Sequence, residues 1–287
     1  EITETKFLGY DQTETQVEVQ AYRKEGKRNA VILNQTPFYA ESGGQVADTG
    51  TLSNGNIEVK VQEVQKSQGR FIHYLDRMPK DLSGSWKASV DVNRRKEIEK
   101  HHSVTHLVHA ALKRVLGEHV AQKGSLVDDH HMRFDFSHFE ALNSEQLDRI
   151  EELVNEKIRQ NIPLREERDI PIEEAKERGA TMLFGEKYGD KVRVITFDPE
   201  YSMELCGGTH VKATGEIGYF RFIQETSVAA GIRRVEGVSG KEADDYLRDE
   251  KHTISAIKDV IGTSDQLADH VKKLLEDKKQ LEKELEK

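Results

Sequence analysis

The chain has a single cysteine, Cys206, and His210 follows it four positions later in the segment SMELCGGTHV. A thiolate and an imidazole are both ligands that zinc prefers. The two glycines between them permit a tight turn that directs both side chains toward one point. Two ligands do not hold a metal tightly, so this segment by itself predicts half of a metal site.

A second pair of ligands stands in the segment HHSVTHLVH, where His102 and His106 are four residues apart. On a helix this spacing places two imidazoles on one face, one turn apart, and His109 lies one further turn along the same side. Either pair alone is better explained by ordinary histidines and a buried, inert thiol. Together with Cys206 and His210 they favour zinc over magnesium or calcium, which prefer oxygen ligands.

The sequence leaves the role of such a zinc open. Four protein ligands complete a tetrahedron, as in structural sites, whereas catalysis needs three ligands plus water, or expansion to five. His210 is the ligand least expected to be permanent. Ser103 follows the first histidine where the zinc metalloprotease motif has a glutamate, which argues against a protease.

The composition limits the class of protein. Of 287 residues 36% are hydrophobic and 33% charged, and the net charge of −9 argues against a generally basic nucleic-acid-binding surface. Without a long apolar run, a signal peptide or a second cysteine, we expect a cytoplasmic protein. The chain begins with Glu1 and ends within the charged pattern LEKELEK, which we interpret as a fragment of a larger protein.

Three regions are expected, in an α+β fold. Residues 1–90 contain short β-favouring segments separated by turn signals, which predicts a small β-barrel-like subdomain. Residues 91–240 mix helices and strands without regular alternation, which predicts an α+β core that begins with a long helix at 93–116. Residues 241–287 carry leucines at heptad spacing, which predicts a helical or coiled-coil extension, truncated at its end.

Longer motifs carry a family resemblance, and they extend over nearly the whole chain. These are TPFYAESGGQVADTG, HHSVTHLVHAALKRVLGEHVAQKGSLVD, MRFDFSH, SMELCGGTHVKATGEIGYFRF and AAGIRRVEGVSG. In this order and spacing they resemble the editing domain of alanyl-tRNA synthetase and are similar also to free-standing alanyl-tRNA editing proteins. His101, where the family often has asparagine, and Ala121, where it often has glutamine, depart from the pattern without putting a metal ligand in doubt.

The resemblance implies an activity and its partners. The family hydrolyses the ester of wrongly charged tRNA, chiefly seryl- and glycyl-tRNA(Ala), so the acceptor end of tRNA(Ala) is the expected partner. ATP binding and aminoacylation are implied only for the complete synthetase. A homo-oligomer formed through the C-terminal region is likewise expected only of the full-length protein.

The resemblance also implies roles for particular residues. The implied zinc ligands are His102, His106, Cys206 and His210. The implied catalytic residues of the pocket are Thr105, Gln122 and Arg233. The resemblance places Ser125 near them as a substrate contact. From charge and turn chemistry we expect Arg94, Arg95, Gly43 and Gly44 to contact the tRNA, with a solvated charged surface and an ordinary tight turn as the alternatives.

Several alternatives remain open at this level. Since no Cys–His or Ser–His nucleophile pair is evident, we expect direct attack by water without a covalent intermediate. The hydroxyl of Thr105 has an ordinary alternative, a hydrogen bond to its own helix backbone. For the function of the whole chain there are two alternatives. One is a tRNA-binding or dimerisation module whose zinc only holds the fold, and the other is a metal-dependent hydrolase of another small ester or amide.

Overall fold

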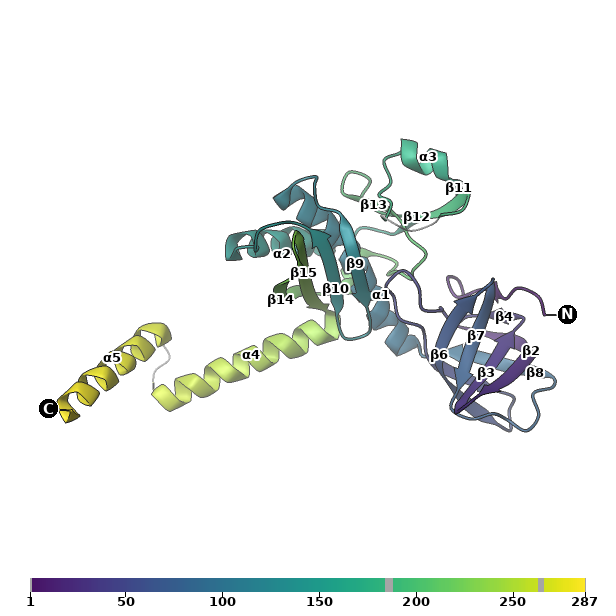
Figure 1. Ribbon diagram of the computed structural model, residues 1–287, viewed down its shortest axis with the longest axis horizontal. Helices are drawn as coiled ribbons and strands as arrows, with labels where there is room; N and C mark the ends of the chain where they lie inside the picture. The colour runs from purple at the N-terminus through teal and green to yellow at the C-terminus, as the bar shows by residue number, and fades with distance from the viewer. Residues whose placement is uncertain (1, 184–187, 263–265, 287) are drawn as a thin grey trace. The chain divides into compact units, whose positions relative to one another are not determined.

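The computed structural model describes residues 2–183, 188–262 and 266–286 (Figure 1). The chain divides into two compact units, Glu1–Glu242 and Ala243–Lys287. The α+β class predicted from the sequence is confirmed, with a closed barrel in the first unit. None of the described helices combines the length and the apolar character needed to cross a membrane.

The barrel is built from six antiparallel strands in the order β2-β3-β7-β6-β5-β8. Their bounds are β2 (Glu14–Glu25), β3 (Arg28–Leu33), β5 (Gly50–Ser53), β6 (Glu58–Ser67), β7 (Arg70–Leu75) and β8 (Ser85–Val90). Alternate residues point inward, so Val59, Val61, Trp86 and Ala88 are buried in its core. A two-stranded parallel sheet, β1 (Lys6–Phe7) with β4 (Gln35–Thr36), accompanies it. The predicted β-barrel is therefore confirmed.

The long helix predicted after the barrel is α1 (Val92–Leu116). It begins at Asp91, whose side chain accepts a hydrogen bond from the backbone N–H of Arg94. It ends at Gly117, whose φ of 120° suits glycine because other residues avoid positive φ. Its apolar side chains join the core of the first unit, which fixes the direction in which its histidines project.

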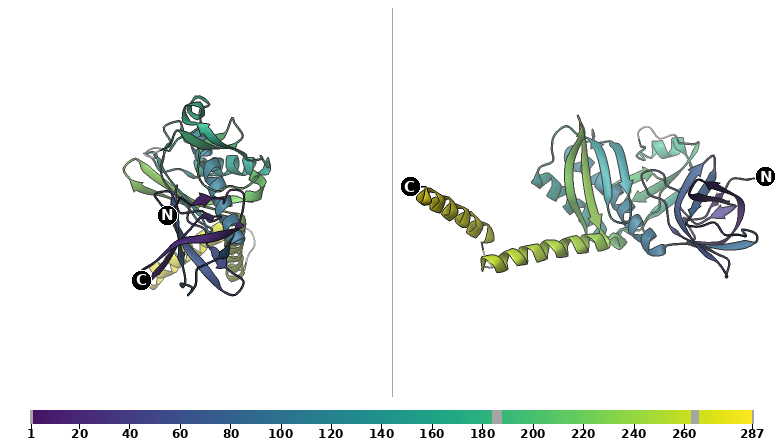
Figure 2. Two further views of the ribbon diagram at one scale, coloured as in Figure 1. Left: turned by 90° about the vertical axis from the view of Figure 1, so that its right-hand side faces the viewer. Right: turned by 60° about the horizontal axis from the view of Figure 1, so that its bottom comes forward.

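A four-stranded antiparallel sheet in the order β14-β15-β10-β9 packs against α1. Its strands are β9 (Gln122–Val127), β10 (Met132–Ser137), β14 (Phe220–Ala229) and β15 (Ile232–Ser239). Helix α2 (Ser144–Arg159) begins with a capping box formed by Asn143 and Gln146. Both helices lie on the same face of the sheet (Figure 2). Phe134, Phe136 and Phe220 are fully buried between the layers.

A smaller sheet supplies the second half of the candidate site. It consists of β11 (Arg165–Pro171), β12 (Lys191–Phe197) and β13 (Ser202–Leu205), with the short helix α3 (Ile172–Glu177) beside it. The 3-10 helix η1 (Thr214–Ile217) follows. Because β13 ends at Leu205, Cys206 is the first residue after a buried strand.

Helices make up the second unit. Helix α4 (Gly240–Ile261) begins at the end of the first unit, and α5 (Leu267–Leu285) follows. No residue of α5 is buried, and Leu274, Leu275, Leu281 and Leu285 are exposed. The helical extension is observed, whereas the coiled coil stays a prediction.

Candidate metal centre and adjoining cavity

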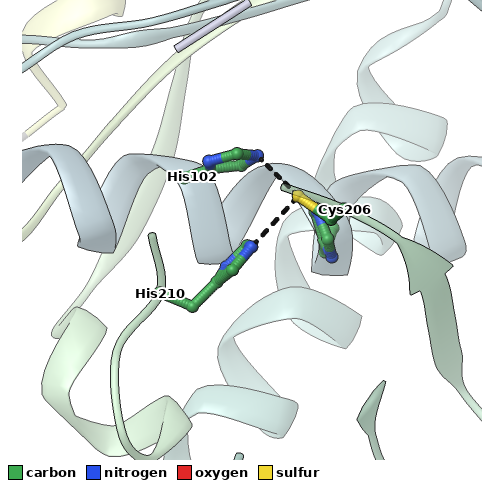
Figure 3. Close-up of side chains that lie close together, drawn as sticks. His102, Cys206 and His210 are labelled. Atoms are coloured by element: carbon green, nitrogen blue, oxygen red, sulfur yellow. Dashed lines mark hydrogen bonds between the residues drawn. The ribbon is translucent and has the colours of Figure 1, made fainter. Parts of the chain in front are cut away.

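Four side chains from distant parts of the sequence meet at one point in the first unit. His102 and His106 project from α1, and Cys206 and His210 come from the loop after β13. One donor atom of each residue lies within 4.8 Å of the others. Cys206 Sγ is 3.4 Å from His102 Nε2 and 3.3 Å from His210 Nε2 (Figure 3). This cluster contains all four residues that the motifs had suggested as ligands.

The protonation of these histidines suits metal binding. Burial lowers the pKa of His102 and of His210 well below the usual value, and the neighbouring histidines lower both further. Burial also lowers the pKa of His106, although Glu204 opposes that shift. The three rings are therefore neutral near pH 7, as metal ligands must be, and three imidazoles with one sulfur fit zinc.

The outer ring nitrogens of two histidines are held by hydrogen bonds. His102 Nδ1 donates to Gln45 Oε1 at 2.6 Å, because an amide oxygen only accepts. Ser103 Oγ lies 2.9 Å from His210 Nδ1 and accepts the backbone N–H of Val211. Both contacts leave Nε2 directed at the sulfur of the cysteine, which is the outer-shell arrangement found around metal-bound histidines.

The two ring nitrogens of the third histidine, His106, have different surroundings. His106 Nε2 lies 3.5 Å from Glu204 Oε2. Its other nitrogen, Nδ1, is buried and has no hydrogen-bond partner among the described residues. A buried, unpaired ring nitrogen is one that a ligand can satisfy, and one donor atom of His106 lies within 4.8 Å of those of the other three residues.

The glycines of the turn Cys206–His210 suggested that its backbone lies close to a neighbouring group. Such a close contact is found at one of the two glycines. A Cβ on Gly208 would lie 2.0 Å from His102 Cε1, whereas one on Gly207 would meet nothing nearer than 3.8 Å. The Gly208 N–H donates to Cys206 Sγ at 3.4 Å. Arg193 stabilises the same turn by donating hydrogen bonds to the backbone carbonyls of Cys206 and Gly208.

The glycine turn of the N-terminal region docks on β9. Gly43 and Gly44 have φ of 59° and 82°, and Ser42 and Gln45 exchange backbone hydrogen bonds across them. A Cβ on Gly44 would lie 2.7 Å from Ser125 Oγ, so only glycine fits there. The turn thus carries Gln45 to the metal cluster.

Gln45 joins the two halves of the cluster. While its Oε1 accepts from His102, it also accepts the backbone N–H of Thr209 at 2.9 Å. Its Nε2 donates to Thr209 Oγ1 at 2.9 Å, so every polar atom of this fully buried amide is used. One side chain therefore ties α1 to the Cys206–His210 turn.

A cavity of about 150 Å³ adjoins the cluster. Three of the cluster residues line it, together with Gly43, Thr105, Gln122 and Ser125, as the sequence led us to expect of pocket residues. Thr105 Oγ1 donates to the backbone carbonyl of His101 at 2.7 Å, which is the ordinary helix contact considered above. Its proton is thus committed, and only its lone pairs face other groups.

Comparison with known proteins agrees with this architecture. The family model "Threonyl and Alanyl tRNA synthetase second additional domain" matches residues 192–236, and that of class II (A) tRNA synthetases matches residues 2–96. Alanine–tRNA ligase of Salinibacter ruber is 54% identical over 254 residues, which are 87% of this chain and 26% of the ligase. That of Cytophaga hutchinsonii is 47% identical over 287 residues, 99% of this chain and 33% of the ligase.

The chain is a relative of the alanyl-tRNA synthetases. It spans between about a quarter and a third of the length of these relatives, so it corresponds to a segment of them. The first family match contains Cys206, His210 and Arg233, while His102 and His106 lie in neither match. The predicted family resemblance is confirmed.

Arg233 of this synthetase relative is not among the described residues that line the cavity. It stands on β15 opposite Phe136, which in turn stands opposite Gln122, so the three share one face of the sheet. The guanidinium forms two hydrogen bonds with Glu225, at 2.6 and 2.8 Å. Its expected catalytic role stays a prediction.

The two arginines at the start of α1 differ sharply. Arg95 is 3% exposed, and it pairs with buried Asp48 and donates to two backbone carbonyls of the N-terminal region. This burial argues against the expected contact between Arg95 and a substrate. Arg94 is half-buried, donates to the carbonyl of Ala47 at 2.8 Å and pairs with Asp129 at 3.0 Å.

Glu204 is a site residue that our reasoning from the sequence missed. It stands on β13 two residues before Cys206, so the alternation of the strand places both on one side. Its Oε1 lies 2.7 Å from His109 Nδ1, and its other oxygen faces His106. Burial alone would raise the pKa of Glu204, but the two histidines outweigh it and lower the pKa to about 2. Glu204 and His109 both line the cavity.

Proposed function

We propose that the first unit hydrolyses the ester of mischarged tRNA(Ala), chiefly seryl- and glycyl-tRNA(Ala), at a site that contains zinc. The observation that carries the proposal is the meeting of His102, His106, Cys206 and His210 beside a cavity of about 150 Å³. A cavity of this size accommodates a small amino acid and a few water molecules. The kinship with alanine–tRNA ligases supplies the substrate class.

The chemistry demands little of the protein. An aminoacyl ester is already activated, so hydrolysis needs a water held near the carbonyl carbon and donors for the developing oxyanion. Zinc, when bound, would supply Lewis acidity for that water or carbonyl. Gln122 and Ser125 offer polar side chains on the cavity wall, and Thr105 offers an acceptor. In this scheme the protein orients the ester and excludes bulk water, and no covalent intermediate forms.

A second candidate is a tRNA-binding or dimerisation module whose zinc only holds the fold. The observation in its favour is the full set of four donors, because a closed tetrahedron leaves no position for water. The outer hydrogen bonds of His102 and His210 add to it, since they restrain both rings. The two candidates differ in one measurable respect, which is turnover.

The decisive experiment is single-turnover deacylation of purified seryl-, glycyl- and alanyl-tRNA(Ala), with zinc content measured in parallel. We expect the wild-type chain to hydrolyse the first two and to spare the third. Cys206→Ala is expected to lose zinc and at least tenfold in rate. Binding of tRNA without any hydrolysis would favour the module.

A matched pair of variants separates loss of zinc from general damage to the loop. Gly208→Ala forces a methyl group against the His102 ring, so we expect it to lose most of its zinc. Gly207→Ala has room for the same methyl group and is expected to keep the metal. Equal zinc contents in the two variants would contradict the geometry proposed for the site.

The remaining roles follow from the same proposal. The acceptor end of tRNA(Ala) would approach the turn at Gly43 and Gly44, of which Gly43 is exposed. Arg94 is the arginine of the helix start that retains some exposure for such a contact. An oligomer of the full-length protein would form through the C-terminal helices, where Leu274, Leu275, Leu281 and Leu285 are exposed.

A further inference from the structure

The glycine turn after β13 is bound along its carbonyl oxygens by two side chains. Arg193 Nη1 lies 2.9 Å from the carbonyl oxygen of Cys206 and 2.6 Å from that of Gly208. The hydroxyl of Tyr10 donates to the carbonyl oxygen of Gly207 between them. Three consecutive carbonyls are therefore held, by one residue from the segment between β1 and β2 and by one from β12.

The bond from Tyr10 has a consequence for the sulfur of Cys206. A peptide unit is planar and trans, so its N–H group points away from its carbonyl group. One such unit joins Gly207 to Gly208. Its carbonyl oxygen accepts from Tyr10, and its N–H donates to Cys206 Sγ at 3.4 Å. The hydroxyl of Tyr10 thus fixes the peptide plane that gives the sulfur a hydrogen-bond donor.

The next peptide unit, between Gly208 and Thr209, is fixed in the same way. Its carbonyl oxygen accepts from Arg193, and its N–H donates to Gln45 Oε1 at 2.9 Å. The same oxygen of Gln45 accepts from His102 Nδ1 at 2.6 Å. The contacts on the carbonyl side of the turn therefore orient groups that touch two of the four candidate ligands.

Tyr10 and Arg193 are themselves held in a network of rings and charges. The guanidinium carbon of Arg193 lies 3.9 Å from the centroid of the Tyr10 ring, and that of Arg168 lies 5.1 Å from it. Both arginines donate to Glu166 Oε1, at 2.8 and 2.6 Å respectively. Arg168 also forms two hydrogen bonds of 2.8 Å with Asp11. These contacts restrain the ring that carries the hydroxyl.

We propose that Tyr10 is a positioning residue of the metal centre, which acts by holding the carbonyl of Gly207 and with it the hydrogen bond from Gly208 to Cys206 Sγ. The inference rests on the proposed function, because it takes Cys206 to be a zinc ligand. An N–H donor stabilises the thiolate, which is the form that binds a metal. Without the hydroxyl, a peptide unit between two glycines gains freedom to rotate.

Tyr10→Phe tests the hydroxyl alone, because phenylalanine keeps the ring beside both arginines. We expect zinc affinity, measured by competition with a chromophoric chelator, to fall roughly tenfold. The melting temperature of the metal-free protein should stay close to that of the wild type. Tyr22→Phe is the matched control: its side chain is on an exposed residue, at 68%, so its zinc affinity should equal that of the wild type.

A second readout reports on the sulfur directly. In protein loaded with Co²⁺ in place of zinc, the charge-transfer absorption from the thiolate to the metal depends on the hydrogen bonds that the sulfur accepts. We expect this band to shift in Tyr10→Phe and to be unchanged in Tyr22→Phe. A tyrosine that only stabilised the fold would leave the band where it is.

The outcomes separate this inference from the function beneath it. A Tyr10→Phe variant with a wild-type cobalt spectrum and a zinc affinity changed less than about twofold would overturn the inference and leave the proposed function standing. Equal losses of affinity in Tyr10→Phe and Tyr22→Phe would also overturn it. A wild-type chain that binds neither Zn²⁺ nor Co²⁺ would remove the metal centre, and the proposed function with it.

Discussion

Apolar residues recur at helical spacing in both long helices α1 and α5, but the two helices have opposite surroundings. Of the 25 residues of α1, thirteen are buried, among them the histidines of the candidate site. None of the 19 residues of α5 is buried. Helical periodicity predicted both helices, yet only the packing partners of α1 turn its residues into a site. The comparison implies that substitutions near α1 have large effects and those on α5 small ones.

The largest effect is expected at the first turn of α1. Arg95→Ala removes the partner of buried Asp48 and leaves that carboxylate uncompensated, which costs about 3–5 kcal/mol of unfolding free energy. Its neighbour is the matched control: Arg94→Ala should cost about 1 kcal/mol or less, because its ion pair is partly solvated. Urea unfolding measures both. Similar losses in the two variants would contradict the distinction between them.

A pH effect extends the comparison to the barrel interior. Burial lowers the pKa of His73 from 6.5 to about 4, so the unfolded chain takes up a proton in this range that the folded barrel excludes. His73 therefore contributes about 3 kcal/mol to the unfolding free energy above pH 6.5. This contribution is lost as the pH falls toward 4.

The corresponding variant is His73→Gln, which cannot titrate. Unfolding free energies measured at intervals from pH 7 to 4 should fall less steeply in it than in the wild type. His270→Gln on α5 provides the control, because His270 is exposed. An unchanged slope in His73→Gln would show that the barrel admits the proton without cost.

A smaller effect is expected where the glycine turn supports α1. Gln45→Ala removes the acceptor that orients His102, so zinc affinity should fall roughly 10- to 100-fold while the ligands stay in place. Competition with a chromophoric chelator measures the affinity. Gln35→Ala, at an amide that only donates to the carbonyl of Gln16, is the control. Unchanged zinc affinity in Gln45→Ala would mean that the ring of His102 is held by its helix alone.

The smallest effect is expected on α5 itself. Leu281 is 59% exposed, so Leu281→Gln should change the unfolding free energy by no more than about 0.5 kcal/mol. Leu107→Ala on α1 removes a fully buried side chain and should cost about 2–5 kcal/mol. If Leu281→Gln lowered the unfolding free energy by an amount that increases with protein concentration, the contrast between α1 and α5 would be wrong. That result would support the predicted coiled coil.

Local features of the chain were readable because their causes are local. The long helix expected at 93–116 is observed as Val92–Leu116, because its periodicity and its caps depend on residues within a turn or two. By contrast, Gln45, Glu204 and Arg193 hold the site through contacts with residues far along the chain. No spacing rule connects Gln45 with His102, so these supports could not be predicted.

The sequence by itself determined which residue types were available for chemistry and which segments became helices and strands, since propensity, capping and periodicity act over a few residues. It also determined the family, through motifs in a characteristic order. Only the tertiary structure decided that Arg95 forms a buried ion pair while Arg94 keeps some exposure, and that Glu204 contacts both His106 and His109. Those outcomes depend on which side chains from distant segments pack together and exclude water. Such burial is a property of the folded chain and cannot be read from neighbouring residues.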